Sequence, residues 1–345
     1  MTRRAMGCVL RLACLAVAGT AAAQTTPEPF TFRFNAGEAQ TYAAAMHLRM
    51  SMDMSAGNDH MLQKMDMGAR YNVTLTPAEG STEGAARLHL TTADIEADWD
   101  MTLPSAHIVV SLKAGEMVGT RDGVVIIDTA HHIGTDEAEE IEKDLMPLYL
   151  SGYVVLDPRG QVIRFEGDPP FVKFWTDEGE GEVGFFTVVL PAKGVAVGDT
   201  WEEHTALHKL GSIRLEGEGL TCTATFKRAP DAIRDGRAVA VFNLDAPFDH
   251  QGLVGYLSEG GQRMKVNINR FKRTATGTTY FDADLGRLTE AGVTVDGTAS
   301  MTGQLPDGTI QIEAKIGGDM HFRLVPPAAA VRVAHYLMPC PNAGT

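Results

Sequence analysis

The chain has 345 residues, of which 44% are hydrophobic, and its 30 lysines and arginines against 44 aspartates and glutamates give a net charge of −14. A surface this acidic repels nucleic acid and anionic lipid head groups, so we expect no nucleic-acid partner. The hydrophobic fraction is enough for a sizeable core in one large or two modest domains.

Residues 1–23 are expected to be a signal peptide. Arg3 and Arg4 precede an apolar run over residues 6–18, and three alanines before Gln24 supply the small residues that a signal peptidase needs. The run is too short to span a bilayer, so we expect a periplasmic or secreted protein and not an integral membrane protein. Its removal, with Arg3, Arg4 and Arg11, leaves 27 basic and 44 acidic residues and a net charge of −17.

The most informative stretch, residues 40–76, has the pattern of one long β-hairpin with methionine on a single face. Every even position from Tyr42 to Met54 is apolar, and after the turn-like residues 55–60 the parity of the apolar positions changes. This period of two is typical of half-buried strands. On a helix, Leu48 and Met52 would lie about 200° away from Met50, so no single apolar face would form.

The predicted register brings the sulfur atoms of both strands together. Pairing Met54 with Met61 keeps all the thioethers on one side of the hairpin. The other opposed pairs are then Met50 with Met65 and Leu48 with Met67. The candidate ligand-binding residues are Met46, Leu48, Met50, Met52, Met54, Met61, Met65, Met67 and Tyr71.

This methionine face allows three interpretations. The side chains could simply fill the core, because methionine is a flexible gap filler. They could line a pliable apolar groove for an acyl chain or another lipid-like ligand. They could also bind Cu(I), which favours thioethers, through Met50, Met52, Met54 and Met61 with His60. The face extends well beyond one coordination shell, which favours an apolar stripe over a metal site.

Shorter β patterns follow the hairpin at residues 87–90, 95–101, 108–112, 124–127, 153–156 and 162–165, separated by turn residues. One helix is predicted at residues 136–150, where Asp136 and Glu139 form a capping-box pattern and acids fill the first turn. The acidic, glycine-rich residues 177–185 are typical of a solvated linker.

The second half of the chain loosely repeats the first. Gly37 and Glu38 before Tyr42 are echoed by Gly198 and Asp199 before Trp201, and the turn at residues 157–162 is echoed at 282–288. We expect a mainly β fold of two related antiparallel, curved β units, open-barrel or half-barrel like, with the helix inserted in the first. The expected parts are a signal peptide at 1–23, a first β unit at 24–176, a linker at 177–185, a second β unit at 186–326 and a C-terminal tail at 327–345.

Residues 190–201, which read LPAKGVAVGDTW, resemble the LPxKPVKVGDxW signature of an uncharacterised family of exported bacterial β-rich proteins. Members of this family also carry a Met-rich segment near the mature N-terminus, like residues 46–67, and a DPxGxV turn, like residues 157–162. Gly194 stands where proline is usual. The resemblance implies an exported β-rich fold, similar in outline to the open, curved sheets of lipoprotein carriers in the bacterial envelope. It implies no catalytic residues.

No catalytic or metal-binding motif is present. The sequence lacks the G-x-S-x-G, S-x-x-K and H-E-x-x-H patterns. His204 and His208 would lie about 13 Å apart on a strand, too far for one zinc ion, and His131 and His132 are expected to be exposed. Cys222 alternates with apolar neighbours in a core-facing pattern, and with Cys340 it could form one disulfide in an oxidising compartment.

These patterns predict a non-catalytic exported protein that needs no cofactor. It would bind an apolar or lipid-like ligand, or a protein partner of the cell envelope, on the methionine face. A periplasmic Cu(I)-binding protein and an unrecognised hydrolase are the alternatives.

Overall fold

The computed structural model describes residues 28–57, 59–82, 84–134, 151–172, 188–210, 213–217, 220–259, 262–305 and 308–326. The first half contains β1 (Gln40–Ala56), β2 (Asp59–Pro77), β3 (Ala86–Leu103), β4 (Ala106–Lys113), β5 (Glu116–Arg121), β6 (Val124–Asp128), the 3-10 turn η1 (Thr129–His131), β7 (Gly152–Leu156) and β8 (Val162–Glu166). The second half contains β9 (Thr200–Leu207), β10 (Lys209–Leu210), β11 (Ile213–Leu215), β12 (Leu220–Arg234), β13 (Arg237–Glu259), β14 (Gln262–Asp282), β15 (Arg287–Leu305) and β16 (Gly308–Leu324).

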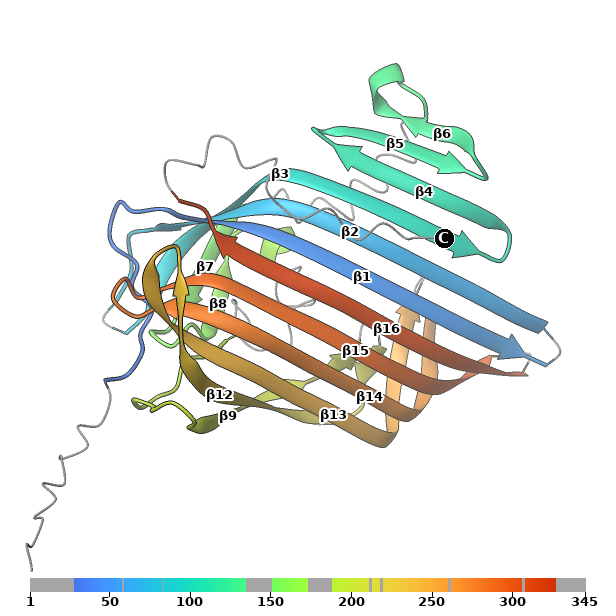
Figure 1. The fold of residues 1–345 in the computed structure, drawn as a ribbon. Helices are drawn as coiled ribbons and strands as arrows, with labels where there is room; N and C mark the ends of the chain where they lie inside the picture. The colour runs from blue at the N-terminus through green and yellow to red at the C-terminus, as the bar shows by residue number, and fades with distance from the viewer. Residues whose placement is uncertain are drawn as a thin grey trace, which may run out of the picture.

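All sixteen strands belong to one antiparallel sheet (Figure 1). Its main path is β10-β11-β13-β14-β15-β16-β1-β2-β3-β4-β5-β6, with β12 joining β13 to β9 and β7 joining β3 to β8. The path ends at β10 and β6, so the described sheet stays open. The predicted mainly β, antiparallel and curved fold is therefore confirmed.

The pair formed by β1 and β16 lies in the middle of the sheet (blue beside red in Figure 1). The two strands are in register from Tyr42 opposite Leu324 to Ala56 opposite Ile310. The strands of the first predicted β unit lie on the β1 side of this pair, and those of the second unit lie on the β16 side. The ladder between β1 and β16 joins the two groups into one continuous sheet. The division into two related units stays a prediction.

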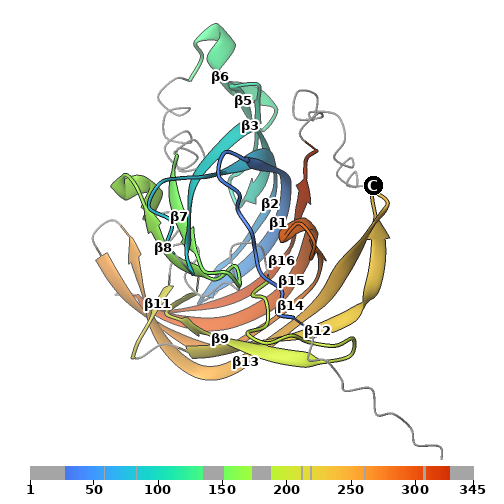
Figure 2. The same cartoon turned by 90° about the vertical axis from the view of Figure 1, so that its left-hand side faces the viewer.

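The sheet is bent into a trough (Figure 2). One cluster of buried side chains combines Tyr42 of β1, Phe281 of β14 and Phe322 of β16 with Phe32 of the N-terminal segment and Val154 of β7. Residues from strands far apart along the sheet can share a cluster only if they face a common interior. Even-numbered positions of β1 therefore point into the trough.

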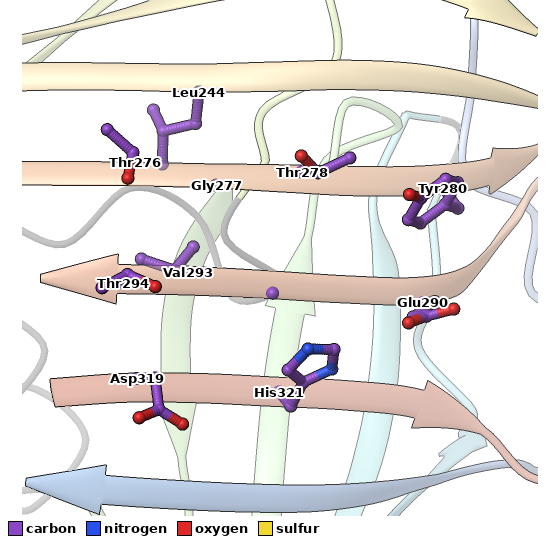
Figure 3. A pocket seen from close by; sticks show the side chains of 11 residues that line it. Leu244, Thr276, Gly277, Thr278, Tyr280, Glu290, Val293, Thr294, Asp319 and His321 are labelled. Atoms are coloured by element: carbon purple, nitrogen blue, oxygen red, sulfur yellow. The ribbon is translucent and has the colours of Figure 1, made fainter.

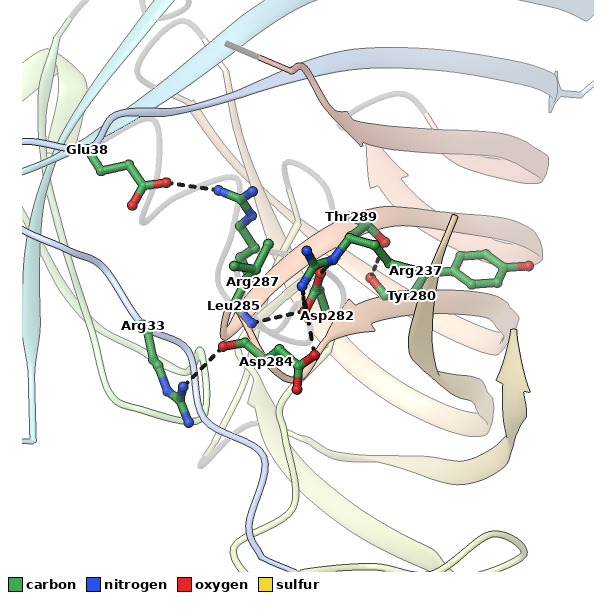
Figure 4. Close-up of polar contacts among 9 residues, drawn as sticks. All are labelled: Arg33, Glu38, Arg237, Tyr280, Asp282, Asp284, Leu285, Arg287 and Thr289. Carbon is green, nitrogen blue, oxygen red and sulfur yellow. Dashed lines mark hydrogen bonds and ion pairs between the residues drawn. The ribbon is translucent and has the colours of Figure 1, made fainter. Parts of the chain in front are cut away.

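Polar contacts hold the N-terminal segment across one end of the trough (Figure 4). Asp282 is only 1% exposed and accepts a hydrogen bond of 2.6 Å from Nε of Arg237. Arg33 donates to a backbone carbonyl of the same β14–β15 turn at 3.2 Å, and Arg287 donates to Glu38 at 3.0 Å. The turn thus fixes the chain that leads into β1.

The short strands predicted for the first half are confirmed, since they fall within β3, β4, β6, β7 and β8. The turn at residues 157–160 also forms, with the Asp157 side chain accepting hydrogen bonds from the amides of Arg159 and Gln161. The predicted helix, linker, signal peptide and C-terminal tail lie outside the described residues. Within the described part of the chain, no helix combines the length and apolar character needed to cross a membrane.

Candidate functional site: the methionine face

The register of the β1–β2 hairpin is the one predicted from the sequence. The opposed pairs are Met54 with Met61, Met50 with Met65 and Leu48 with Met67. The turn is tighter than predicted, because Ala56 already pairs with Asp59. The predicted pairing of the hairpin is confirmed, and the role of the face in ligand binding stays a prediction.

Burial along the methionine face is graded. At one end, Tyr42 is completely buried and Tyr71 is 8% exposed, both within the main core cluster. At the hairpin end, Met61 is 41% exposed. Between them, the half-buried candidates are Met46, Leu48, Met50, Met52, Met54, Met65 and Met67. The core covers only part of this face, and the rest is partly accessible apolar surface.

Other strands widen the apolar face in ways that the hairpin sequence alone does not reveal. Met50 lies opposite Ile316 of β16, and Met54 lies opposite Ile312. On the other side, Met65 lies opposite Met101 of β3. The alternation of isoleucines in β16 was a visible signal for a half-buried strand, but it did not say which strand would be the neighbour.

Two packed clusters flank the half-buried part of the face. Met46 packs against the main core cluster at one end of the trough. Met52 packs against a second cluster, which includes Leu207 of β9, Phe248 of β13 and Phe271 of β14. Leu48 and Met50 of β1 therefore lie between two packed regions.

The opposite face of the same strands is polar. His47 Nε2 lies 2.6 Å from a carboxylate oxygen of Asp66, and its Nδ1 lies 3.7 Å from Asp319. His60 lies 3.9 Å from Asp53 on this polar face. The sequence interpretation grouped His60 with the thioethers, and that grouping is wrong, because neighbouring strand residues point to opposite faces.

Two depressions are formed mainly by the polar face. One depression, of about 430 Å³, lies over β14, β15 and β16, and Gly292 is among its lining residues (Figure 3). Its polar lining residues are Thr276, Thr278, Tyr280, Glu290, Thr294, Asp319 and His321. The other, of about 950 Å³, lies over a row of cross-strand neighbours that includes Lys64, Lys272 and Lys315. These surfaces can form hydrogen bonds and ion pairs, and the lining of the larger one also includes Met50, Met65 and Ile316 from the rows of the methionine face.

The described residues offer no conventional metal centre. No group of three or more His, Cys, Asp or Glu side chains among them could hold an ion. His204 and His208 are exposed on and beside strand β9, as expected from the sequence, and His204 lies 3.0 Å from the Thr223 hydroxyl. His131 is exposed and bonded to Asp128 at 2.8 Å, and this hydrogen bond lowers the pKa of the Asp128 carboxyl.

Cys222 faces the trough from β12, where it is half-buried against the second core cluster. Its thiol is free within the described residues, and Cys340 lies outside them. Burial raises the pKa of the Cys222 thiol, and the positive charge of Arg273 opposes that rise. A raised pKa disfavours the reactive thiolate, so this thiol does not have the environment of a nucleophile.

No protein-family model matches the sequence, and comparison with curated proteins also finds no match. Among solved structures, a structure of lipovitellin that concerns lipid–protein interactions is similar to this chain. The TM-score is 0.43, with 10% identity over 85% of this chain. The chain spans about a quarter of that protein, 26% of its length.

Two bacterial structures are similar at lower scores. OccK7 of Pseudomonas aeruginosa has a TM-score of 0.23 and 9% identity, over 84% of this chain and 100% of that one. A BenF-like porin from Pseudomonas fluorescens Pf-5 has a TM-score of 0.18 and 8% identity, over 84% of this chain and 100% of that one. At these scores the three similarities carry no functional argument, and the site must be judged from its own geometry.

Proposed function

We propose that the protein is a non-catalytic carrier or receptor that holds an apolar, lipid-like ligand against the methionine face. The observation that carries this proposal is the register of β1 and β2, which aligns their thioethers on one face that stays only half-buried. Methionine adapts its three rotatable bonds to irregular apolar shapes, which suits a surface that must accept a flexible acyl chain.

The trough geometry supports the same role. Leu48 and Met50 of this face lie between two packed clusters, which hold the sheet on both sides of them. A ligand laid on this part would cover apolar surface without disturbing the core. Burial of apolar surface would supply the binding free energy, at about 25 cal/mol for each Å² covered.

We further propose that the protein works in the periplasm or outside the cell and belongs to the exported β-rich family that its sequence resembles. The arginine-led apolar segment at residues 6–18 and the signature at residues 190–201 support these two assignments. A protein partner in the cell envelope is compatible with the same apolar face.

Native mass spectrometry of the full chain, purified without detergent, tests the ligand proposal. We expect a mass excess that is lost on denaturation and recovered as lipid in an organic extract. A bare mass, together with no binding of the apolar dye N-phenyl-1-naphthylamine, would reject the proposal. Trp99 offers a control for location, because it lies opposite Met67 on the same face, and bound dye should quench its fluorescence.

Binding of Cu(I) is a second candidate, because the register brings four thioethers, those of Met50, Met54, Met61 and Met65, onto neighbouring strands. The Met50–Met65 and Met54–Met61 rows are four residues apart, about 13 Å, and Met52 lies in the row between them, about 7 Å from each. An ion would therefore be held by Met52 together with one of these two pairs. Metal analysis of the purified chain after incubation with Cu(I) under reducing conditions tests it. Stoichiometric retained copper would support this candidate, and background copper would reject it.

A further inference from the structure

A cation of β14 shares the concave face with apolar residues. Arg273 of β14 alternates with Phe271 and Ala275, which are 9% and 8% exposed and face the interior. Its neighbours in sequence, Lys272 and Thr274, line the depression on the polar face instead. The positive charge of Arg273 also opposes the pKa rise of the Cys222 thiol, which faces the trough from β12.

Arg273 is in the same cross-strand row as the methionine face. It lies opposite Gly297 of β15, which lies opposite Ile316 of β16, and Ile316 lies opposite Met50. Three strand spacings of about 4.8 Å separate Arg273 from Met50, a path of about 14 Å along the arc of the sheet. One acyl chain in a bilayer, half of its 30 Å hydrocarbon thickness, spans about the same distance.

The surroundings of Arg273 are apolar. In the concave rows from Ala44 to Met54, across β1, β16, β15 and β14, Arg273 is the one charged residue described. Its other neighbour across the ladder is Phe248, which is 6% exposed. Gly297 beside it has no side chain, which leaves room next to the guanidinium on the side that leads to Met50.

Among the described residues, Arg273 has no ion-pair partner. Its Nε atom is buried and makes no hydrogen bond, and no acid of the described residues forms an ion pair with it. Arg270, three residues earlier on the polar face, shows the contrast, because it donates to both carboxylate oxygens of Asp249 at 3.0 and 2.7 Å. Arg273 as a whole is half-buried, and a buried Nε without an acceptor costs free energy, so an anionic partner from outside would stabilise it.

We propose that the ligand of the trough is an acyl chain with a single carboxylate, as in a long-chain fatty acid, whose head group pairs with Arg273 and whose chain runs over Ile316 toward Met50. This inference rests on the proposed function and names the class of ligand. A planar guanidinium donates two parallel hydrogen bonds to a carboxylate, and both are strong in a low-dielectric setting. The methionine face then accepts the hydrocarbon chain.

Displacement of N-phenyl-1-naphthylamine from the full chain at pH 8 tests this assignment with three ligands. These are oleate, methyl oleate, which has the same chain without the charge, and dioleoylphosphatidylglycerol, which has a phosphate head group. We expect oleate to bind at least tenfold more tightly than methyl oleate. Equal affinities for these two ligands, or tighter binding of the phospholipid than of oleate, would overturn the carboxylate assignment while leaving the apolar site intact.

Variants of Arg273 and Arg270 test which guanidinium pairs with the carboxylate. Arg273→Leu should remove the preference for oleate over methyl oleate, and Arg273→Lys should keep part of it. Arg270→Leu removes a charge from the same strand on the polar face and should change neither affinity. An oleate preference that survives in Arg273→Leu would overturn the role of Arg273, whereas absence of dye and ligand binding in the unaltered protein would reject the proposed function itself. Circular dichroism of each variant checks that it folds.

Discussion

Met50 of β1 lies directly opposite Met65 of β2, and the two half-buried thioethers face the concave side of the sheet. Each also has an apolar neighbour on its other side, Ile316 for Met50 and Met101 for Met65. The pair is therefore one segment of an apolar row that crosses several strands. The contribution of the sulfur atoms in this row can be tested separately from that of its apolar surface.

Replacing Met50, Met52 and Met54 together by leucine should preserve binding of apolar ligands. Leucine has nearly the volume and hydrophobicity of methionine, so the stability change for each replacement should stay below about 1.5 kcal/mol. Copper binding would be lost, because leucine has no sulfur. Dye displacement and metal analysis on the same preparation distinguish the two functions. A triple variant that loses ligand affinity by tenfold or more would contradict a purely apolar role for these side chains.

The two faces of β1 should respond differently to a new carboxylate. Leu48→Asp puts a charge on the half-buried apolar face and should lower the free energy of unfolding by about 2 kcal/mol. Ser51→Asp puts the same charge on the polar face, opposite Lys64 and Lys315, and should change it by less than about 0.5 kcal/mol. Urea unfolding of both variants gives the comparison. Equal losses would mean that the two faces do not differ in environment.

The buried carboxylate of Asp282 should matter for stability. It accepts hydrogen bonds from Nε of Arg237 at 2.6 Å and from the amide of Leu285 at 2.9 Å. Asp282→Asn removes the charge and should cost about 2 kcal/mol, because a buried charge-assisted hydrogen bond is lost. Asp284→Asn is the matched control, since Asp284 is 90% exposed and 3.8 Å from Arg237, and its cost should be near zero. Thermal unfolding measures both variants, and equal losses of stability in the two would contradict this prediction.

Glu166 should make stability depend on acid pH. The hydrogen bond from Arg87, assisted by Arg164, holds the pKa of the Glu166 carboxyl below its ordinary value. A carboxyl with a lower pKa in the folded state stabilises the fold fully above its unfolded pKa, about 4.3, and loses that effect as the pH falls through the folded value.

The stability difference between the natural chain and Glu166→Gln should therefore be present at pH 7 and shrink toward zero near pH 3. Urea midpoints at the two pH values measure it. A difference that grows on acidification would show that the sign of the pKa shift is wrong.

Cys222 should report on the charge of Arg273. Burial raises the pKa of its thiol and Arg273 lowers it, so Arg273→Leu should raise it further and reduce the thiolate fraction at any fixed pH. In a chain with Cys8, Cys14 and Cys340 replaced by serine, alkylation by iodoacetamide at pH 8 should then slow. Arg270→Leu should leave the rate unchanged, and an equally unchanged rate in Arg273→Leu would show that the two groups do not interact.

Local periodicity was enough to predict the hairpin, because the pairing of Met54 with Met61 depends only on alternation and a short turn. It could not predict that β16 would lie beside β1, since strands distant in sequence carry no mark of their partner. Arg273 was missed for the same reason. One charge in a mixed run of apolar and polar residues has no assigned face until the register of its strand is known.

The length of β13 was also hidden, because Pro247 interrupts a pattern that would otherwise indicate a strand. Proline lacks the amide that a central strand must donate. Between Asp245 and Gly255, however, the β-ladder of β13 joins it to β14 alone, since β12 pairs only as far as Asp245 and β11 begins at Gly255. Pro247 therefore lies on a locally free edge, where the missing amide costs nothing.

The ladder between β1 and β16 has a consequence for how the protein reaches its native state. The two strands come from opposite ends of the described chain and meet at the middle of the sheet, so the methionine face is complete only after β16 has been synthesised and has docked. Closing so long a loop before its contacts form makes folding slow. Until then, one edge of β1 presents unpaired amides and carbonyls beside exposed methionines, and the nascent polypeptide needs protection from aggregation.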